Sequence, residues 1–172
     1  MSDDGCYVGL TYEHLNAQQT MDKVRSPEAG AIVLFAGRSH LQYSVTQLYS
    51  LTISRQGTTR DNFAGKPVKE LQYTAYNKLA LRSMLSICRD MKEKHGLKGI
   101  AMIHRLGTVP IGEESILIAL SSPHRQAAWR AGEEALEECK AKVEVWKREE
   151  FEGEDGVWRA NRDGAAGQKV NE

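Results

Sequence analysis

Two stretches of this chain carry apolar residues at helical spacing, and each is flanked by short runs typical of strands. The first helical stretch covers residues 76–95 and ends before Gly96. The second begins at Ser122-Pro123, because serine is a good N-cap and proline favours the first helical position. The strand-like runs cover residues 30–35, 68–75, 99–105, 115–121 and 143–148, with a short return at 157–158. This order predicts an α+β fold with a mainly antiparallel sheet and flanking helices.

Each predicted helix presents one apolar stripe that we expect to be buried. In the first helix the stripe consists of Tyr76, Leu79, Ala80, Met84, Ile87, Cys88 and Met91. In the second it consists of Ala128, Ala131, Ala135, Leu136 and Cys139. The sequence also predicts a short helix within residues 11–24 capped by Thr11, and turns over 107–114 and 152–156. We expect a single domain over residues 1–172, with loose tails at 1–8 and 165–172.

The composition suits a globular domain, since 41% of the 172 residues are hydrophobic and 27% are charged. Twenty-three basic residues balance 23 acidic ones, which argues against bulk nucleic-acid binding but leaves room for a local anion pocket. No apolar run reaches the roughly 18 residues of a membrane span, and the acidic start is unlike a secretory signal. The cysteines, Cys6, Cys88 and Cys139, are scattered, so we expect reduced thiols in a cytosolic protein and no metal site.

The densest signal for a binding site is His124-Arg125, at the start of the second predicted helix. The helix dipole and the free N–H groups there favour an anion, and Arg125 adds a forked donor. His124 could bind a phosphate or move a proton. Arg60 and Arg162 are further candidates for anion binding. The alternative for each of these side chains is a solvated position on the surface.

Two lysines near the end of the second helix are candidate nucleophiles or bases. Lys140 ends the helix, and Lys147 lies in the strand-like run VEVWKRE. Apolar neighbours partly desolvate an amine, which lowers its pKa and makes it more reactive. The alternative is two surface lysines whose stems cover apolar surface. His104, beside Arg105 in an otherwise apolar run, is interpreted as a structural histidine with its hydrogen bonds satisfied.

Four segments together resemble the large, catalytic subunit of molybdopterin synthase. They are AGAIVLFAG, GTTRDNFAGKPVKELQYTAY, IHRLGTVPIGEESILIALSSPHR and LEECKAKVEVWKREEFEGEDGVW. The match runs from about Gly9 to Arg162 and keeps many motifs in order, so it is more specific than any single motif. The resemblance implies an α/β hammerhead-type fold. It implies no cofactor in this subunit, because metal enters the pathway later.

The resemblance also implies a sulfurtransferase of molybdenum cofactor biosynthesis. Such an enzyme converts cyclic pyranopterin monophosphate into molybdopterin by installing two dithiolene sulfurs. The sulfur arrives as a thiocarboxylate on the C-terminal Gly-Gly of a small, ubiquitin-like subunit. The implied assembly is a heterotetramer in the cytosol, with a homodimer of large subunits at its centre and one small subunit at each end. Neither nucleic acid nor a membrane is an expected partner.

The motifs of that family place the candidate catalytic residues at Lys140 and Lys147. The substrate-binding positions implied by the resemblance are Thr58, Thr59, Arg60, His124, Arg125, Lys140, Lys147, Arg148, Glu149 and Arg162. Arg162 matches an arginine that the family reaches across the dimer. In this reading the arginines and His124 neutralise the substrate phosphate and the polar edge of the pterin. Lys147 holds the substrate or assists proton transfer, and Lys140 acts beside the thiocarboxylate.

Residues 38–57 depart from the family pattern. They are rich in Ser, Gln, Thr and Tyr, contain no acidic residue, and separate the strand IVLFAG from TTRDNFAGK. Removing them restores the pattern, their length is a whole number of codons, and Gln56 can be encoded by a usual intron end. We interpret the segment as a retained or wrongly assigned intron. The alternative is a genuine surface loop, which proteins tolerate at modest entropic cost.

Two other functions remain open at this point. One is a non-catalytic binding module for a ubiquitin-like partner, with the pocket kept but turnover lost. The other is a protein of another class that binds a pterin or nucleotide phosphate and needs no small subunit. The presence of both Lys140 and Lys147 favours the enzyme.

Overall fold

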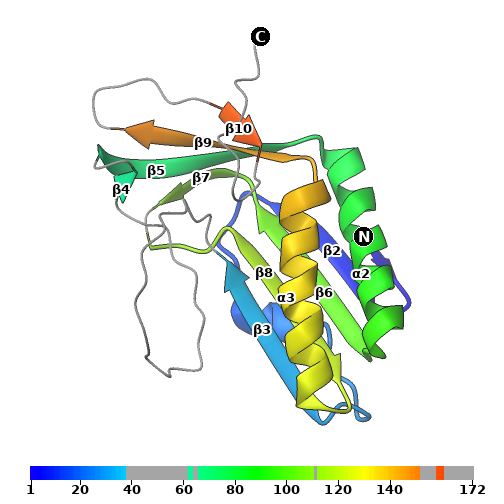
Figure 1. Ribbon diagram of the computed structural model, residues 1–172. Helices are drawn as coiled ribbons and strands as arrows, with labels where there is room; N and C mark the ends of the chain where they lie inside the picture. The colour runs from blue at the N-terminus through cyan, green and yellow to red at the C-terminus, as the bar shows by residue number, and fades with distance from the viewer. Residues whose placement is uncertain (38–61, 64–65, 111, 152–157, 161–172) are drawn as a thin grey trace.

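A computed structural model describes residues 1–37, 62–63, 66–110, 112–151 and 158–160 (Figure 1). The helices are α1 (Ala17–Asp22), α2 (Asn77–His95) and α3 (Arg125–Lys142). A first sheet contains β1 (Ser2–Asp3), β2 (Cys6–Thr11), β3 (Ala31–Gly37), β6 (Gly99–Arg105) and β8 (Ile116–Ser122). A second sheet contains β4 (Asn62–Phe63), β5 (Lys66–Ala75), β7 (Gly107–Pro110), β9 (Val145–Phe151) and β10 (Trp158–Ala160).

Antiparallel pairing dominates both sheets. The first sheet has the order β1-β2-β6-β8-β3, and the second has the order β10-β9-β5-β4 with β7 also on β5. Among the strands that the structure describes, only β2 and β6 pair in parallel. The predicted α+β class with a mainly antiparallel arrangement is therefore confirmed. The structure divides the strands between two sheets, whereas the sequence predicted one.

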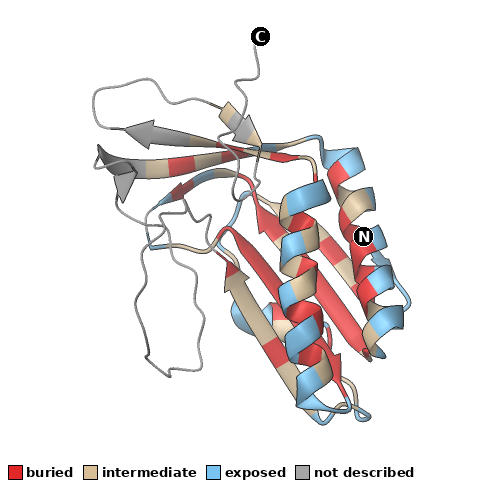
Figure 2. Ribbon diagram, viewed as in Figure 1, coloured by how far each residue is buried: buried red, intermediate tan, exposed pale blue. Residues whose placement is uncertain are grey.

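Helices cover both faces of the first sheet. α2 and α3 pack side by side on one face, and α1 packs against β3, β6 and β8 on the other (Figures 1 and 2). The alternation along the strands matches these layers: Ile100 and Met102 of β6 belong to the core under α2 and α3, whereas Ala101 packs with Val24 on the α1 side. Every residue of β8 is buried as a result.

The two long helices form where the apolar periodicity predicts them. Gly96 ends α2 with φ 61°, in the left-handed region that glycine adopts easily. The predicted buried stripe of α2 is confirmed at Ala80, Met84, Ile87, Cys88 and Met91, but Tyr76 and Leu79 are exposed. Tyr76 is the N-cap, so the stripe turns toward the core only one turn later.

The predicted stripe of α3 is also confirmed, since Ala128, Ala131, Ala135 and Cys139 are buried and Leu136 packs against the core. Gly132 belongs to the same stripe. A Cβ at that position would lie 2.0 Å from Phe35 Cε2, so the absence of a side chain lets the helix approach β3 closely.

Two predicted helix starts are wrong, one near the N-terminus and one at the second long helix. Thr11 does not cap a helix, because pairing with Arg105 on β6 keeps it in β2; Asn16 caps α1 and accepts a hydrogen bond from Gln19 N at 2.9 Å. Ser122 does not cap α3, because it still pairs with Ala31 in β8; the N-cap is His124. In both cases strand pairing holds the chain extended beyond the expected helix start.

Residues 1–8 are ordered, contrary to the predicted loose tail. β1 pairs with β2, and the Met1 ammonium donates a hydrogen bond to Val8 O at 2.9 Å. Residues 107–110 also differ from prediction, because they form β7 along β5 with Val109 fully buried. Residues 38–57, the turn at 152–156 and the tail at 165–172 lie outside the described residues. None of the described helices has the length and hydropathy to span a bilayer.

Candidate functional site

Lys147 is a charged residue buried in the second sheet. β9 alternates so that Val145 and Lys147 are buried, whereas Trp146 and Arg148 are half-buried. The Lys147 residue is only 3% exposed. Its cross-strand partner on β5 is Tyr73, which is also 3% exposed. Of the two interpretations that the sequence left open for Lys147, the burial supports a desolvated amine and not a surface lysine.

Lys140 lies in the last turn of α3 and is more accessible. Its side chain is 18% exposed, and its Nζ lies 3.6 Å from Glu137 Oε1. Glu137 is mostly exposed, so solvent weakens this ion pair. Lys140 follows the buried Cys139, which anchors the turn against the core. The Lys140 ammonium therefore lies at the edge of the core and is more exposed than Lys147.

The turn between the two lysines is fixed to α2. Val143 N donates to Cys139 O at 3.0 Å, and Tyr76 N donates to Glu144 O at 3.2 Å. The Ser83 hydroxyl donates to Glu144 Oε2 at 2.9 Å. These bonds connect the end of α3 and the start of β9 to the first turns of α2. Lys140 and Lys147 therefore extend from a rigid corner of the fold rather than from a free loop.

His124 and Arg125 are both exposed at the start of α3. His124 caps the helix with its backbone, makes no side-chain capping bond, and its carbonyl accepts the Ser122 hydroxyl. The first turn of α3 contains no acidic residue. The helix dipole and the Arg125 guanidinium therefore leave this end of α3 attractive to an anion.

The two halves of the predicted site do not meet within one chain. His124 precedes Lys140 by sixteen residues of the same helix, which corresponds to about 24 Å along the axis. Lys140 lies in the last turn of α3 and Lys147 in β9, the next element of the chain, whereas His124 and Arg125 lie at the opposite end of α3. The sequence already places His124 at the start and Lys140 at the end of one predicted helix, whereas the resemblance assigns all four residues to one substrate site.

Several predicted site residues lie outside the part of the chain that the structure describes. Thr58, Thr59, Arg60 and Arg162 are among the residues that the structure does not describe, and only the backbone of Glu149 is described, within β9. Arg148 is half-buried on β9, on the face opposite Lys147. Within the described residues no group of three or more histidine, cysteine or acidic side chains gathers where a metal ion could be held.

Two buried polar residues near Lys147 were not predicted as part of the site. Tyr73 and His104 lie with their ring centroids 5.2 Å apart and their planes at 65°. The alternation of β5 does place Tyr73 on a buried face, but the sequence does not reveal which strand it pairs with. Next to them Arg105 is buried, forms an ion pair with Glu113, and donates from Nη2 to Thr108 O at 3.1 Å.

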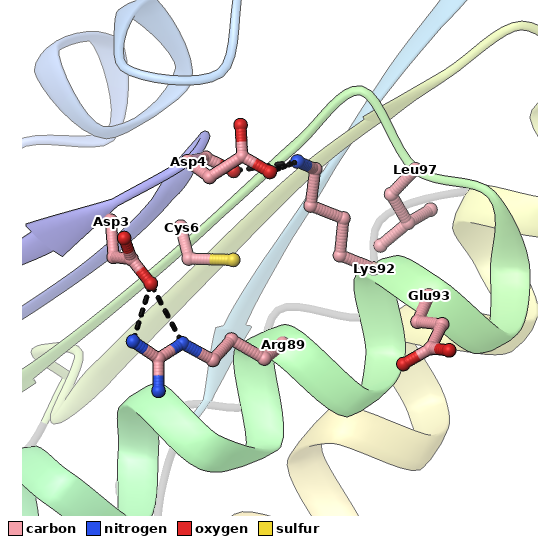
Figure 3. A pocket seen from close by; sticks show the side chains of 7 residues that line it. All are labelled: Asp3, Asp4, Cys6, Arg89, Lys92, Glu93 and Leu97. Carbon is pink, nitrogen blue, oxygen red and sulfur yellow. Dashed lines mark hydrogen bonds and ion pairs between the residues drawn. The ribbon is translucent and has the colours of Figure 1, made fainter.

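A surface cavity of about 410 Å³ lies elsewhere, between the N-terminal strands and the second half of α2 (Figure 3). It is lined by Asp3, Asp4, Cys6, Arg89, Lys92, Glu93 and Leu97. Arg89 is paired with Asp3, and Lys92 is paired with Asp4. These pairs attach the N-terminus to α2 and neutralise the cations of the cavity. Its α2 residues, Arg89 to Glu93, lie about 20–26 Å along the helix axis from Tyr76, the residue of α2 that bonds to the turn between the lysines. We therefore assign the cavity a structural role.

The fold and this corner define an α+β protein that carries two amines, one buried and one accessible, on rigid supports. The sequence model of a family described as "MoaE protein" matches residues 42–142. A molybdopterin synthase catalytic subunit from Pyricularia oryzae is 68% identical over 171 residues, which cover 99% of this chain and 83% of that protein. The chain therefore belongs to the MoaE family, as its resemblance predicted.

Solved structures agree with the family at the level of the fold. Molybdopterin synthase from Staphylococcus aureus has a TM-score of 0.72 and 28% identity, with 87% of this chain and 94% of that chain covered. A complex of subunits 1 and 2 of molybdopterin-converting factor from Helicobacter pylori has a TM-score of 0.61 and 16% identity, with 86% and 87% covered. The second likeness shows the fold alone.

Proposed function

We propose that this chain is the catalytic subunit of a molybdopterin synthase, a sulfurtransferase of molybdenum cofactor biosynthesis. The observation that carries the proposal is the pair Lys140 and Lys147 on one rigid corner of a chain that belongs to the MoaE family. The substrate is cyclic pyranopterin monophosphate. The sulfur donor is the C-terminal thiocarboxylate of a small, ubiquitin-like subunit.

The different burial of the two lysines supports different roles for them. Lys140 is accessible, so it receives the thiocarboxylate tail and stabilises the charge that builds up as sulfur leaves its acyl carbon. Lys147 is buried, so its ammonium acts in a medium of low dielectric and attracts an anionic substrate group strongly. Lys147 therefore holds the substrate and assists proton transfer in this proposal.

The length of α3 supports a site shared between two copies of the chain. His124 and Arg125 lie about 24 Å from Lys140 along the helix, which is too far for one small phosphorylated substrate to contact both ends. We propose that the α3 N-terminus of a second large subunit supplies His124 and Arg125 to the pocket. Arg60 and Arg162 are proposed to complete the phosphate site, with Thr58, Thr59, Arg148 and Glu149 as further substrate contacts.

A small ubiquitin-like subunit is the proposed second partner. The Helicobacter pylori structure of similar fold is a complex of two subunits of molybdopterin-converting factor, which supports a heteromeric assembly for this chain. The proposed heterotetramer contains a homodimer of large subunits and two small subunits. The proposed location is the cytosol, in keeping with the buried thiols Cys6, Cys88 and Cys139.

Reconstitution tests the proposal directly. The purified chain is mixed with a thiocarboxylated small subunit and cyclic pyranopterin monophosphate, and molybdopterin is measured as its fluorescent oxidised derivative. We expect product from the wild type and none when the small subunit carries a plain carboxylate. Binding of the small subunit without any product would favour a non-catalytic module instead.

A parallel reaction without residues 38–57 addresses the intron hypothesis. Product only from the trimmed chain supports the hypothesis that the segment is foreign to the native protein. Equal product from both chains makes the segment a tolerated loop. A peptide from residues 39–55 in digests of the native protein would refute the intron directly.

A further inference from the structure

His104 is a buried histidine with one nitrogen left over. It lies near the end of β6 and is 1% exposed. Its Nδ1 lies 2.8 Å from Arg105 O. Because a carbonyl oxygen only accepts, Nδ1 carries the hydrogen and Nε2 carries a lone pair. Among the described residues Nε2 has no hydrogen-bond partner, so the sequence-based reading of a fully satisfied histidine is wrong.

The leftover acceptor lies in the neighbourhood of Lys147. The His104 ring packs edge-on against the Tyr73 ring, with centroids 5.2 Å apart. Tyr73 is in turn the direct cross-strand partner of Lys147. Directly opposite residues of an antiparallel pair project from the same face, with Cβ atoms roughly 5 Å apart. His104, Tyr73 and Lys147 therefore follow one another across the junction of the two sheets. We name these three residues the buried row.

An acceptor of this kind costs stability. A buried polar atom without a partner costs about 1–3 kcal/mol, so a chain selected for stability alone would place an apolar side chain there. Burial also lowers the pKa of His104 to about 4, which keeps the ring neutral near pH 7. A neutral imidazole with a bare Nε2 is suited to receive a hydrogen bond from a cation.

Lys147 is the donor in this row. An ammonium group carries three N–H donors, and a buried one needs acceptors for them. The lone pair of Nε2 adds one buried acceptor beside Tyr73, whatever other contacts the lysine makes. Arg105 follows His104 in β6, so its side chain projects from the opposite face of the strand. Its Nη atoms bind Glu113 and Thr108 O, and its Nε–H has no hydrogen-bond partner among the described residues.

We propose that His104 is a positioning residue for Lys147, whose ammonium donates a hydrogen bond to Nε2 in the assembled enzyme. Tyr73 sets the spacing between the two, and the bond fixes the amine against the sheet during sulfur transfer. The inference rests on the proposed function, since Lys147 is the group that it positions.

Three substitutions separate this role from a structural one. His104→Phe keeps a flat ring but removes both nitrogens. His104→Asn keeps a donor near the Nδ1 position, which can still reach Arg105 O. His104→Gln places its amide oxygen near the Nε2 position and restores the acceptor. Each variant is assembled with the thiocarboxylated small subunit, and kcat, KM and the melting temperature are measured.

We expect kcat to fall about tenfold in His104→Phe and in His104→Asn, and to recover largely in His104→Gln, with KM changed by less than about twofold. The melting temperature of His104→Phe is expected to stay level or to rise. Equal kcat in the Asn and Gln variants, or a loss confined to KM, would overturn the proposal. If His104→Phe does not fold, the comparison of Asn with Gln decides alone.

A spectroscopic measurement keeps the inference independent of turnover. The ¹⁵N resonance of His104 Nε2 is recorded in the wild-type complex and in the complex of Lys147→Met. Loss of the donor should move the resonance toward that of a free imidazole acceptor, and an unchanged resonance would contradict the bond. A wild-type complex that makes no molybdopterin would refute the proposed function, whereas an active wild type with unaffected His104 variants would refute only this inference.

Discussion

The two sheets treat their buried faces differently. In the first sheet, β8 is buried over all seven residues, and its interior is apolar from Ile116 to Leu120. In the second sheet, β9 buries Lys147 beside Val145, and β5 buries Tyr73 opposite that lysine. The buried His104 and Arg105 belong to the first sheet, but they lie where β6 ends and the chain crosses into β7 of the second.

We call the first sheet, whose interior is apolar, the supporting layer. We call the second sheet, which buries the polar side chains Lys147 and Tyr73, the working layer. Apolar burial contributes about 25 cal/mol per Å², so β6 and β8 stabilise the fold directly. A buried amine and an unpaired imidazole nitrogen do the opposite, because they cost desolvation. Because Lys147 and His104 lower the stability of the fold, we expect them to contribute to the reaction instead. Substitutions test this comparison: a change in the second sheet should mainly lower turnover, and a change in the first sheet should mainly lower stability.

The largest effect is expected at Lys147. Lys147→Ala removes the buried ammonium, and we expect molybdopterin formation to fall on the order of 10²–10⁴-fold. Because Lys147 has an interaction partner in the fold that the substitution leaves behind, the free energy of unfolding should also fall, so turnover is compared where the variant is fully folded. Reconstituted turnover and thermal melting measure the two effects.

The matched control for that substitution is Lys142→Ala, since Lys142 is exposed on α3 and paired with Glu138. This variant should keep turnover near that of the wild type. Normal turnover in Lys147→Ala would remove the lysine from the mechanism and leave the second sheet without a working role.

The next largest effect concerns the first sheet. Leu120→Ala opens a cavity in a strand that is covered on both faces, and it should lower the free energy of unfolding by about 2–5 kcal/mol. Turnover of the folded fraction should remain close to normal, because Leu120 belongs to the apolar core cluster and carries no polar group that could act on a substrate. Leu79→Ala, at an exposed leucine, is the control and should cost far less. A strong loss of turnover at a temperature where Leu120→Ala is fully folded would break the division between the layers.

Much of the supporting layer could be predicted from the sequence, and most of the working layer could not. The apolar run from Gly99 to Arg105 predicted β6 with its observed bounds, because a strand that is covered on both faces is apolar along most of its length. The predicted helix starts at Thr11 and Ser122 were wrong, because pairing with a distant strand decides the conformation there. Pairing is a property of two segments, so a single segment does not reveal it.

The candidate site divides in the same way. Its lysines could be named from motifs, but the sequence left the burial of Lys147 open between a desolvated amine and a surface lysine. The contact between Tyr73 and His104 could not be foreseen, because the two residues lie on strands of different sheets. The separation of His124 from Lys140 follows from the length of the predicted helix, but the resemblance does not say that the two residues lie too far apart for one substrate.

A moderate effect is expected when the pH is lowered. Burial lowers the pKa of His104 to about 4 in the folded protein, from about 6.5 when the chain is unfolded. The unfolded chain therefore binds more protons between these values, so the contribution of neutral His104 is complete above pH 6.5 and is lost as the pH falls toward 4. Between pH 7 and pH 5 the loss amounts to about 2 kcal/mol.

Urea unfolding at the two pH values measures this loss, with His104→Gln as the reference. Paired carboxylates such as Glu134, whose pKa is lowered by Lys94 and His95, weaken in acid in both proteins and cancel in the difference. The wild type should lose about 2 kcal/mol more than the variant. Equal losses would mean that the histidine is not held neutral by burial, and His104 would then no longer support the difference between the two sheets.

The smallest effect is expected at the N-terminus, where Arg89 pairs with Asp3 beside the cavity (Figure 3). Both side chains are about half-exposed, so the pair should contribute about 0.2–1 kcal/mol in a double-mutant cycle of Arg89→Ala and Asp3→Ala. Added salt should reduce the coupling further, since solvent-exposed charges are screened. Turnover should not change in any of these variants, because the pair lies at the far end of α2 from Lys140 and Lys147. A turnover defect that follows the coupling energy would give this cavity a role in the reaction, and the working layer would then extend beyond the second sheet.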